Sequence, residues 1–484
     1  MLFNSYEFIL VFMPVVVLVF FLVGRASHVL AATWLCMASL FFYGWWNPKF
    51  VALLVASIGF NYAAGYAIGP AKGGRMAAPK LLLIAAIAAD LAVLGYFKYA
   101  NFFISSVDTL TGAKLALLDI VLPLGISFFT FTQIAFLVDV YRGVATEYNF
   151  MHYLLFVSYF PHLIAGPLLH HKQIMPQFAM TRTYAPDPGA IVSGLTMFTI
   201  GLAKKVLVAD NLAGYALPLF TLADNGSELR LISAWSGALA YSFQLYFDFS
   251  GYCDMAIGMS LLLGVRLPVN FNSPYKAESI IEFWRRWHMT LAGFLRDYLY
   301  FPLGGNRRGP RRRHVNIIIT MLLGGLWHGA SWTFVLWGGL HGVYLMINHI
   351  WRERSSRIGP PLAGTALGRV ATIAITFLAV VIGWVIFRAQ TLEGAMIVLR
   401  GMTGLAGASL NELSDIQVGS FPVLALIISA CAVMAFLCPN SQEIVGALQR
   451  RQPSLAAGLV FGMLAGICLI AMRSVQSEFL YFQF

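Results

Sequence analysis

The sequence predicts an all-α, polytopic membrane protein, because it is strongly apolar, poor in charge and built from long continuous apolar segments. Hydrophobic residues make up 59% of the 484 residues and charged residues only 11%, far below the roughly 25% of soluble proteins. Segments such as 8–23, 81–97 and 369–387 have about the length that a helix needs to cross roughly 30 Å of hydrocarbon. We count about eleven or twelve such segments. Their continuity favours transmembrane helices, with added interfacial and re-entrant helices, over the alternating strands of a barrel.

The positive charge is interpreted as an orientation signal rather than as a nucleic-acid surface. The net charge is +11, but the basic residues lie in loops between apolar segments, as they do on the cytoplasmic side of membrane proteins. Two short loops carry Lys72, Arg75 and Lys80, and Arg352, Arg354 and Arg357. We expect both loops in the cytoplasm and the N-terminus outside, with the lipid bilayer and no nucleic acid as partner.

The chain is expected to form one integral membrane domain, residues 1–484, in three parts. Residues 1–105 are predicted scaffold helices, because their apolar segments lack polar groups suited to chemistry. Residues 120–345 are the predicted catalytic core, since Pro, Gly and His interrupt their apolar segments, as in FPHLIAGP at 160–167. Broken helices at membrane depth are tolerated where the backbone is buried in protein or lines a wet cavity, so we expect residues 120–345 to surround such a cavity. Residues 346–484 return to plain C-terminal hydrophobic helices.

The interval 266–314 is predicted to be a basic cytoplasmic loop. Its basic residues after Arg266 are Lys276, Arg285, Arg286, Arg296, Arg307, Arg308, Arg311, Arg312 and Arg313. This charge serves either to orient the protein or to dock the phosphates of a nucleotide-linked donor such as coenzyme A. Within the interval, Trp284 and His288 are spaced one helical turn apart. We expect a helix that lies in the interface or enters the membrane part way.

The strongest catalytic candidate is His328, which lies within the apolar segment LLGGLWHGASWTFVLWGGLHG at 322–342. An ionisable side chain at membrane depth is a functional candidate by default. Neighbouring glycines leave room for a substrate, and Trp327 and Trp332 would supply a water-poor wall. Imidazole stays neutral near pH 7 in such surroundings, as a general base requires. The alternative is a structural histidine that is hydrogen-bonded to a neighbouring helix.

A second histidine, His288, lies beside Arg285 and Arg286 in the same predicted core. Two histidines in one basic, cavity-lining region favour catalysis more than either does alone. The weaker candidates are His341, His162, His170 and His171, because adjacent histidines in a loop are typical of solvated positions.

Two carboxylates, Asp248 and Asp254, lie in an otherwise apolar segment. Each is costly there unless it is paired or wetted. They could pair with Arg285 or Arg286 or help to line the cavity, and a structural ion pair is the preferred interpretation, so neither is assigned to catalysis.

Other chemistries lack the motifs that they require. We find no HExxH, GxSxG, GxxxxGK[ST] or CxxCH pattern. The cysteines are Cys36, Cys253, Cys431, Cys438 and Cys468, and they show no CxxC or Cys/His ligand spacing, so we expect core thiols and neither a disulfide framework nor a metal site. Base catalysis remains, in which a histidine polarises an acceptor hydroxyl for attack on an activated acyl group. Positioned proton transfer contributes roughly 10²–10⁴-fold in rate.

Several motifs spread over nearly the whole length carry a family resemblance. They are FNSYEFILVFMPVV (3–16), SFQLYFDFSGYCDMAIG (242–258), FWRRWHMTLAGFLRDYLYFPLGGNRRG (283–309), GGLWHGASWTFVLWGGLHG (324–342) and FLYFQF (479–484). Together they resemble the membrane-bound O-acyltransferase (MBOAT) superfamily, and in particular its bacterial branch that includes the membrane subunit of alginate O-acetyltransferase.

The resemblance implies a ring of tilted helices around a funnel in a thinned membrane. The invariant histidine of the family corresponds to His328, and the second active-site position, occupied by Asn, Asp or His in different branches, corresponds to His288. Acetyl-coenzyme A is the usual donor and binds from the cytoplasm, with no permanently bound cofactor and no donor-binding residue identified here. The acyl group then passes across the bacterial inner (cytoplasmic) membrane, often to a periplasmic acyltransferase of the serine-hydrolase-like type.

The leading hypothesis is therefore an O-acetyltransferase that moves an acetyl group from acetyl-coenzyme A toward an exported polysaccharide such as alginate. In it His328 is the base, and His288 assists in orientation or proton handling. A related enzyme that transfers D-alanine from a carrier protein to teichoic acid, or that acylates peptidoglycan, lipid or protein, remains open. A transporter of polysaccharide or lipid is a third alternative, against which the lack of an internal repeat argues.

Overall fold

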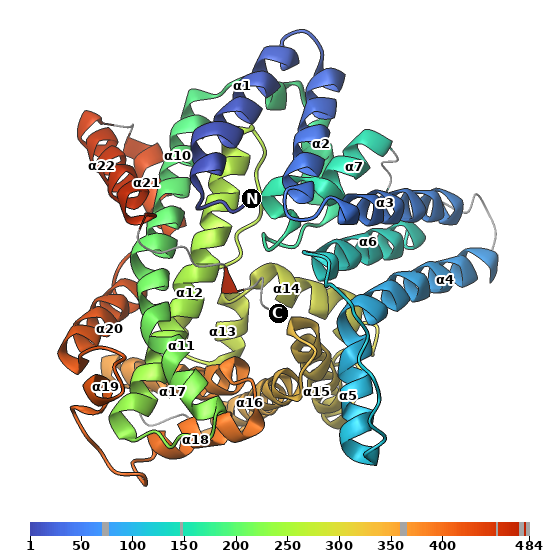
Figure 1. Cartoon of the computed structure of the whole chain (residues 1–484). Coiled ribbons are helices and arrows are strands. Elements are labelled where there is room, and N and C mark those ends of the chain that lie inside the picture. The colour runs from blue at the N-terminus through green and yellow to red at the C-terminus, as the bar shows by residue number, and fades with distance from the viewer. Residues whose placement is uncertain (70–76, 146–148, 359–364, 452–453, 474–478, 481–484) are drawn as a thin grey trace. The chain divides into compact units, whose positions relative to one another are not determined.

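Helices account for the regular structure, as the apolar composition predicts. The computed structural model describes residues 1–69, 77–145, 149–358, 365–451, 454–473 and 479–480, and these contain no β-strand. Figure 1 labels the helices in chain order. The all-α, polytopic membrane fold is confirmed. Lys72 and Arg75, on which part of the topology prediction rests, lie outside the described residues.

Five helices among the described residues are long and apolar enough to cross a membrane. They are Glu7–Gly24, Lys49–Ile68, Pro79–Thr111, Pro188–Asp224 and Ala366–Arg388. The bent pair Phe421–Phe436 and Ser441–Arg450 would make a sixth span, and the apolar helices His28–Gly44, Ile126–Tyr141 and Leu455–Ala471 are shorter. By this criterion the spans are fewer than the eleven or twelve expected, because several apolar segments fold as broken helices that are too short to cross alone.

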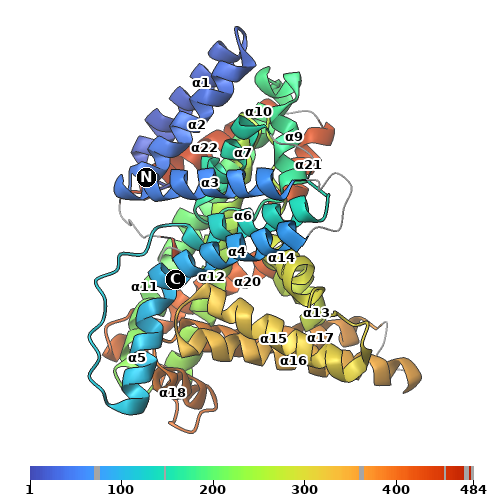
Figure 2. The same cartoon turned by 90° about the vertical axis from the view of Figure 1, so that its right-hand side faces the viewer.

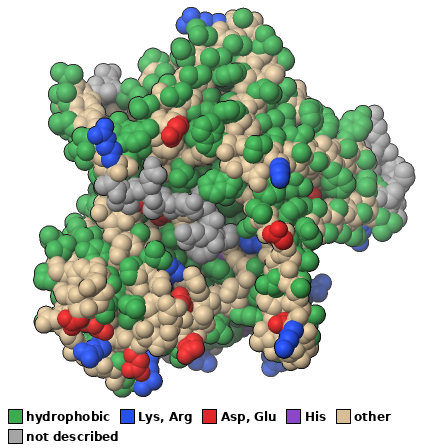
Figure 3. Space-filling view, viewed as in Figure 1, with side chains coloured by type: hydrophobic (Ala, Val, Ile, Leu, Met, Phe, Trp, Pro, Cys, Tyr) green, Lys and Arg blue, Asp and Glu red, His purple; other side chains and the backbone are tan. Residues whose placement is uncertain are grey.

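Large hydrophobic side chains remain exposed on these helices. Leu18, Ile375 and Leu426 are examples from three of the apolar helices. On the face drawn in Figure 3, hydrophobic side chains predominate and charged ones are scattered. Apolar surface of this extent would drive a soluble protein to aggregate, whereas lipid covers it in a membrane protein.

The described chain forms two compact units that alternate along the sequence. The first comprises residues 1–202, 252–269 and 445–472, and the second comprises 203–251, 270–444 and 473–484. The three-part division expected from the sequence follows other boundaries and stays a prediction.

The first unit contains the N-terminal helices and a broken segment. Its helices are α1 (Met13–Gly24), α2 (His28–Gly44), α3 (Lys49–Ile68), α4 (Ala77–Leu94), α5 (Ala100–Thr111), α6 (Ile126–Tyr141), α7 (Phe150–Ser158), α8 (Phe160–Leu163), α9 (His171–Phe178), most of α10 (Pro188–Ala203) and α22 (Leu455–Ala471).

The predicted break at 160–167 is confirmed and is packed inside protein. The short helix α8 follows α7 directly, and the next residues form a turn before α9. His162 is buried, and its Nε2 lies 2.9 Å from the carbonyl oxygen of Phe156. Gly125, at the start of α6, has φ +71°, and a Cβ there would lie 2.8 Å from the carbonyl oxygen of Leu163. This close approach explains a glycine at that position, and His162 acts as a structural histidine.

The second unit contains the remaining helices. They are α11 (Asp210–Asp224), the first two-thirds of α12 (Leu231–Leu262), α13 (Ile280–Arg286), α14 (Met289–Leu295), α15 (Gly309–His328), α16 (Trp332–Ile358), α17 (Ala366–Arg388), α18 (Leu392–Met402), α19 (Glu412–Asp415), α20 (Phe421–Phe436) and the start of α21 (Ser441–Arg451).

Helices α15 and α16 lie side by side in both cartoon views (Figures 1 and 2). Glycines allow this approach. A Cβ on Gly338 would collide with the carbonyl oxygen of Met321, and one on Gly325 would collide with that of Phe334. The glycines that the sequence places around His328 therefore bring two helix backbones together.

A buried ion cluster joins α11, α12 and a π-helical segment, Lys204–Ala209, that precedes α11. The Nζ of Lys205 lies 2.6 Å from Oδ1 of Asp248 and 2.8 Å from Oδ1 of Asp210. The structural ion pair expected for Asp248 is confirmed, but its partner is Lys205 and not Arg285 or Arg286. The lysine precedes the aspartate by 43 residues, so sequence proximity could not reveal the pair.

Candidate active site

The interval 266–314 is not a simple loop. It folds into α13, α14, a π-helical segment (Arg296–Tyr300), a turn and the first residues of α15. The prediction that Trp284 and His288 share one helix face is wrong, because α13 ends at Arg286 and His288 caps the start of α14. His288 has φ +42° and ψ +52°, in the left-handed region that residues with a Cβ rarely adopt. This conformation turns the chain between two short helices and sets the direction of the imidazole.

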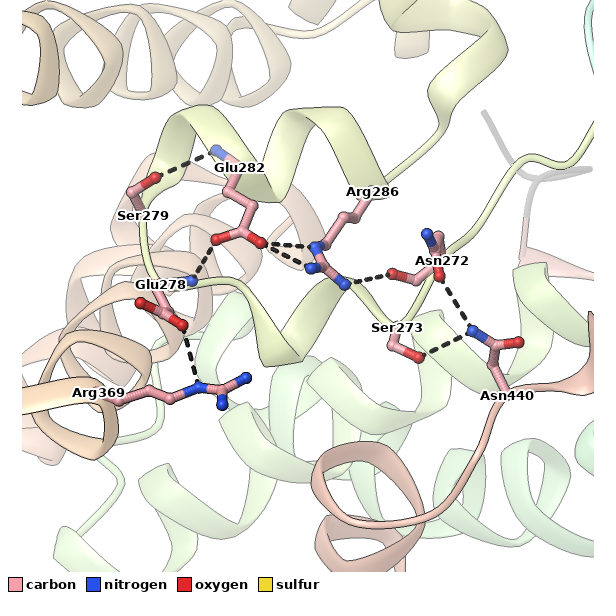
Figure 4. A network of polar contacts seen from close by, with 8 residues as sticks. All are labelled: Asn272, Ser273, Glu278, Ser279, Glu282, Arg286, Arg369 and Asn440. Carbon is pink, nitrogen blue, oxygen red and sulfur yellow. Dashed lines mark hydrogen bonds and ion pairs between the residues drawn. The ribbon is translucent and has the colours of Figure 1, made fainter. Parts of the chain in front are cut away.

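Hydrogen bonds and ion pairs around α13 fix the segment that carries His288 (Figure 4). The Oγ of Ser279 accepts a hydrogen bond from the amide of Glu282, which caps the helix start. The guanidinium of Arg286 donates to Oε1 of Glu282 over 2.7 and 2.9 Å and to the carbonyl oxygen of Asn272 over 3.3 Å. Arg286, which the sequence offered as a possible partner of Asp248 or Asp254, instead binds Glu282 and ties α13 to the preceding segment 270–273.

The same network extends to other parts of the second unit. Asn440 donates to the side chains of Asn272 and Ser273 over 3.0 and 3.2 Å, and Arg369 contacts Glu278 over 3.0 Å (Figure 4). Residues that lie far apart in the sequence thus converge on the 270–288 region.

Asn270 orients the ring of His288. The Oδ1 of Asn270 lies 3.1 Å from Nδ1 of His288, and it also accepts hydrogen bonds from the amide and hydroxyl of Thr290 over 3.2 and 2.9 Å. The Thr290 amide can only donate, so the atom facing it is an oxygen, and Nδ1 of His288 must carry a proton. The Nε2 atom of the neutral ring then carries the lone pair.

His288 is fully buried among aromatic rings. Its ring centroid lies 4.9 Å from that of Phe249 and 6.0 Å from that of Trp327. It lies between α13 and α14, outside the candidate membrane spans. Desolvation lowers its pKa to about 3, so the ring is neutral at pH 7.

His328 is the last residue of α15 and is 4% exposed. Its ring contacts Trp327, Trp337 and Phe387, with centroids 5.0, 5.1 and 5.3 Å away and the rings edge to face. The aromatic wall that the sequence predicts is present, although it includes Trp337 and Phe387, whereas Trp332 is exposed. The C-terminal end of a helix favours a positive charge, so this position would stabilise an imidazolium at His328.

The structure brings the two predicted catalytic histidines together. The ring centroids of His288 and His328 lie 6.3 Å apart. The distance is short enough for both imidazoles to contact one small bound group, although they belong to different helices.

His341, judged a weaker candidate from the sequence, belongs to the same buried cluster. Its ring lies 4.9 Å from that of Trp337, which in turn packs against His328. The indole Nε1 of Trp284 donates to Nδ1 of His341 over 3.3 Å. A Cβ on Gly383 would lie 2.8 Å from Nε2 of His341, so this glycine of α17 makes room for the ring. His341 supports the aromatic wall behind His328.

The other candidates are not part of this cluster. His162, His170, His171 and Asp254 belong to the first unit. Asn270 and Thr290 were missed by sequence analysis. A polar Asn between apolar segments was the available signal, but nothing in the sequence indicated that it faces His288.

The arginines between residues 307 and 313 fall into two groups. Arg307, Arg308, Arg311 and Arg312 are exposed. Arg313 is partly buried, and it contacts Glu353 of α16 over 2.6 Å. The exposed group is available to a solvent-borne anion, so both interpretations of the basic interval stay open.

Two buried imidazoles within an aromatic enclosure suit proton transfer in the absence of bulk water. His328 is placed to take a proton and to hold it as an imidazolium. His288, with its tautomer fixed by Asn270, presents a lone pair from a rigid ring. This arrangement matches general base catalysis of acyl transfer to a hydroxyl group.

Comparisons with known proteins agree with this chemistry. The chain is 39% identical to the peptidoglycan O-acetyltransferase of Helicobacter pylori, over 100% of this chain and 98% of that protein. It is 42% identical to the probable alginate O-acetylase AlgI of Pseudomonas aeruginosa, over 95% of this chain and 89% of that protein. The teichoic acid D-alanyltransferase of Streptococcus thermophilus is 28% identical, over 54% of this chain and 68% of that protein.

Residues 122–386 match the MBOAT, membrane-bound O-acyltransferase family. This range covers more than half of the chain and contains Asn270, His288, His328 and His341. The family resemblance drawn from the motifs is thereby confirmed, and O-acyltransferase activity follows from it. The chain belongs to the membrane-bound O-acyltransferase family.

Proposed function

We propose that the protein transfers an acetyl group from acetyl-coenzyme A toward a hydroxyl group of an exported polysaccharide, with His328 as the general base. The observation that carries the proposal is the pair of buried imidazoles, His288 and His328, 6.3 Å apart in an aromatic enclosure. The acetyl group and the polysaccharide are supported by the relatives that align over nearly the whole chain, which are a peptidoglycan O-acetyltransferase and probable alginate O-acetylases.

The proposed reaction is a single acyl transfer. His328 accepts the proton of the acceptor hydroxyl while the hydroxyl oxygen attacks the carbonyl carbon of the acetyl thioester. A carbon–oxygen bond forms and the carbon–sulfur bond breaks. The proton held by His328 passes to the leaving thiolate, so the products are an O-acetyl ester and free coenzyme A. Each histidine ends the cycle neutral, as it began.

The neighbours of His328 make it an effective base. Trp327, Trp337 and Phe387 exclude water, which strengthens electrostatic interactions at the site and disfavours hydrolysis of the thioester. The helix C-terminus stabilises the imidazolium by roughly 0.3–1 kcal/mol, and by up to about 2 kcal/mol when partly buried. The Nε2 lone pair of His288 is proposed to accept a hydrogen bond from the acceptor hydroxyl and so to orient it.

The two substrates are proposed to arrive from opposite sides of the bacterial inner membrane. The exposed arginines Arg307, Arg308, Arg311 and Arg312 suit the phosphates of acetyl-coenzyme A, since clustered positive charge raises the local concentration of an anionic donor. A periplasmic acyltransferase of the serine-hydrolase-like type is the proposed partner that carries the acetyl group to the polymer. A funnel or tunnel would connect both sides to His328.

The decisive experiment measures transfer of labelled acetyl from acetyl-coenzyme A by the purified protein, supplied with its partner or with an acceptor polymer. We expect His328→Ala to lower kcat by at least the roughly 10²–10⁴-fold attributed to positioned proton transfer. His314→Ala, which removes a partly exposed histidine at the start of α15, is the matched control and should retain activity. If a folded His328→Ala variant transfers acetyl at the wild-type rate, His328 is not the base.

The acceptor is identified in cells. Mass spectrometry of surface glycans, compared between strains with and without the gene, should show the loss of one acetyl increment per modified sugar. Loss from peptidoglycan alone or from an exopolysaccharide alone would select between the two polymers. Loss of D-alanine from teichoic acid, with acetylation intact, would contradict the acetyl proposal.

A further inference from the structure

Three side chains of the first unit converge at the end of α6 and the start of α9. Nε2 of His170 lies 2.7 Å from Oδ2 of Asp139, and Nδ1 of His171 lies 3.5 Å from the same oxygen. One possible ligand atom from each residue lies within 4.8 Å of the other two. Asp139 precedes the two histidines by about thirty residues, so only the fold brings the three together.

The imidazole of His171 is buried beside aromatic rings, and its hydrogen-bonding capacity is not well satisfied. The residue is 5% exposed, and among the described residues neither ring nitrogen makes a hydrogen bond of good geometry, although the backbone of Val144 lies near the ring. Its ring is bordered by Phe136 and Phe156, with centroids 5.9 and 6.5 Å away. Buried polar groups are normally satisfied, and an imidazole in an aromatic pocket that lacks a hydrogen bond is unfavourable unless a further group binds it.

We propose that Asp139, His170 and His171 bind one divalent transition-metal ion, with Zn²⁺ as the best match. Two imidazoles and one carboxylate form a set of nitrogen and oxygen ligands that suits Zn²⁺, whereas Mg²⁺ and Ca²⁺ prefer oxygen ligands alone. Three protein ligands leave a fourth tetrahedral position for water. The side chain of His170 is 34% exposed, which gives the ion and the water a route from the surface.

Metal binding requires only local adjustment. The ion replaces the proton between His170 and Asp139, and the two atoms move apart from their hydrogen-bond distance to that of two ligands on one ion. With Nε2 on the metal, the proton of the neutral His170 ring lies on Nδ1. The contact of Nδ1 with the amide of Lys172, which is already long at 3.4 Å, is then lost. The ammonium of Lys172 belongs to an exposed residue, where solvent screens its repulsion of the ion.

The bound ion would tie the C-terminal end of α6 to the N-terminal end of α9. The proposal does not rest on the proposed acetyl transfer, because Asp139, His170 and His171 belong to the first unit and His288 and His328 to the second. No sequence pattern predicts this site, since Asp139 lies far from the adjacent histidines and neither Cys nor HxxxH spacing is present.

The test uses the full-length protein, purified in detergent with a tag that contains no histidine, stripped with a chelator and incubated with Zn²⁺. After desalting, elemental analysis should find one Zn²⁺ per chain, and Co²⁺ substitution should give the visible absorption of a tetrahedral site. We expect His171→Ala and Asp139→Asn to weaken Zn²⁺ binding at least tenfold. His28→Ala, which removes an exposed histidine of the same unit, should bind Zn²⁺ as the wild type does.

A second readout covers variants that fold poorly. Zn²⁺ should raise the Tm of the wild-type protein and leave the Tm of Asp139→Asn unchanged. The proposal is overturned if stripped wild-type protein retains no Zn²⁺ after desalting, or if Asp139→Asn and His171→Ala retain as much Zn²⁺ as the wild type.

Discussion

The side-chain oxygen of Asn270 lies 3.1 Å from Nδ1 of His288, and this contact determines which ring nitrogen of the histidine carries the proton. The same oxygen accepts hydrogen bonds from Thr290, which fixes the amide in turn. A residue from the segment before α13 therefore orients the ring of a residue after it. In the proposed mechanism, Asn270 positions His288 and does not contact the reacting atoms.

Replacement of Asn270 by Ala should lower kcat more than it changes KM. Loss of one buried hydrogen-bond partner costs about 1–3 kcal/mol, which corresponds to roughly 5–150-fold if the whole effect falls on the transition state. Asn270→Asp can still accept from Nδ1 and Thr290, and it should retain more activity than Asn270→Ala. Steady-state kinetics of acetyl transfer provides the measurement. Equal kcat values for wild type and Asn270→Ala would contradict the positioning role.

Replacement of Arg286 at the end of α13 should lower kcat more than replacement of its neighbour Arg285. Arg286 binds Glu282 and the carbonyl oxygen of Asn272, whereas Arg285 is exposed. Arg286→Ala should loosen the segment 270–273 and lower kcat several-fold, while Arg285→Ala should leave kcat near the wild-type value. The comparison holds charge constant, because each variant loses one positive group. Equal losses of kcat in the two variants would show that charge, and not the network of Figure 4, is what matters.

Addition of a methyl group between α15 and α16 should destabilise the protein. A Cβ at Gly338 collides with the carbonyl oxygen of Met321, which belongs to backbone and cannot rotate away. Overpacking of this kind costs typically about 1–3 kcal/mol. Gly293→Ala is the control, since a Cβ at this position in α14 meets no atom within 4 Å. Thermal unfolding in detergent should show a lower Tm for Gly338→Ala and no decrease for Gly293→Ala.

Removal of the buried ammonium of Lys205 should be more harmful than removal of the whole ion cluster. Lys205→Met leaves Asp210 and Asp248 buried without their cation, a change that typically costs about 3–5 kcal/mol. The triple variant, with Asn also at positions 210 and 248, removes the uncompensated charge and should recover part of the loss. Unfolding measurements on both proteins test this order, and a triple variant less stable than Lys205→Met would reverse it.

The fold class could be predicted from the sequence, and the two candidate histidines could be singled out from it, because both depend on local patterns. Continuous apolar segments require helices in lipid, and a histidine within such a segment stands out wherever the chain folds. The break at 160–167 was also evident, because Pro and Gly act on their own neighbours.

The contacts that hold the candidate sites together could not be predicted, because they join residues that lie far apart in the sequence. Lys205 and Asp248, Asn270 and His288, and Asp139 and His171 each meet only through packing of different helices. The shared helix face expected for Trp284 and His288 failed for a related reason. A left-handed residue breaks the periodicity, and a histidine gives no sequence signal of that conformation. The contact of His341 with Trp284 likewise depends on the packing of different helices.

The π-helical segment Lys204–Ala209 has one further consequence. A π turn contains one more residue than an α-helical turn, so it amounts to a single-residue insertion within an otherwise regular rod. Deletion of one residue there would restore regular winding and rotate everything on one side of it by about 100° relative to the other. The ammonium group could then no longer face both carboxylates. A homologous chain shortened by one residue at this point should therefore have lost the lysine, the two aspartates or all three.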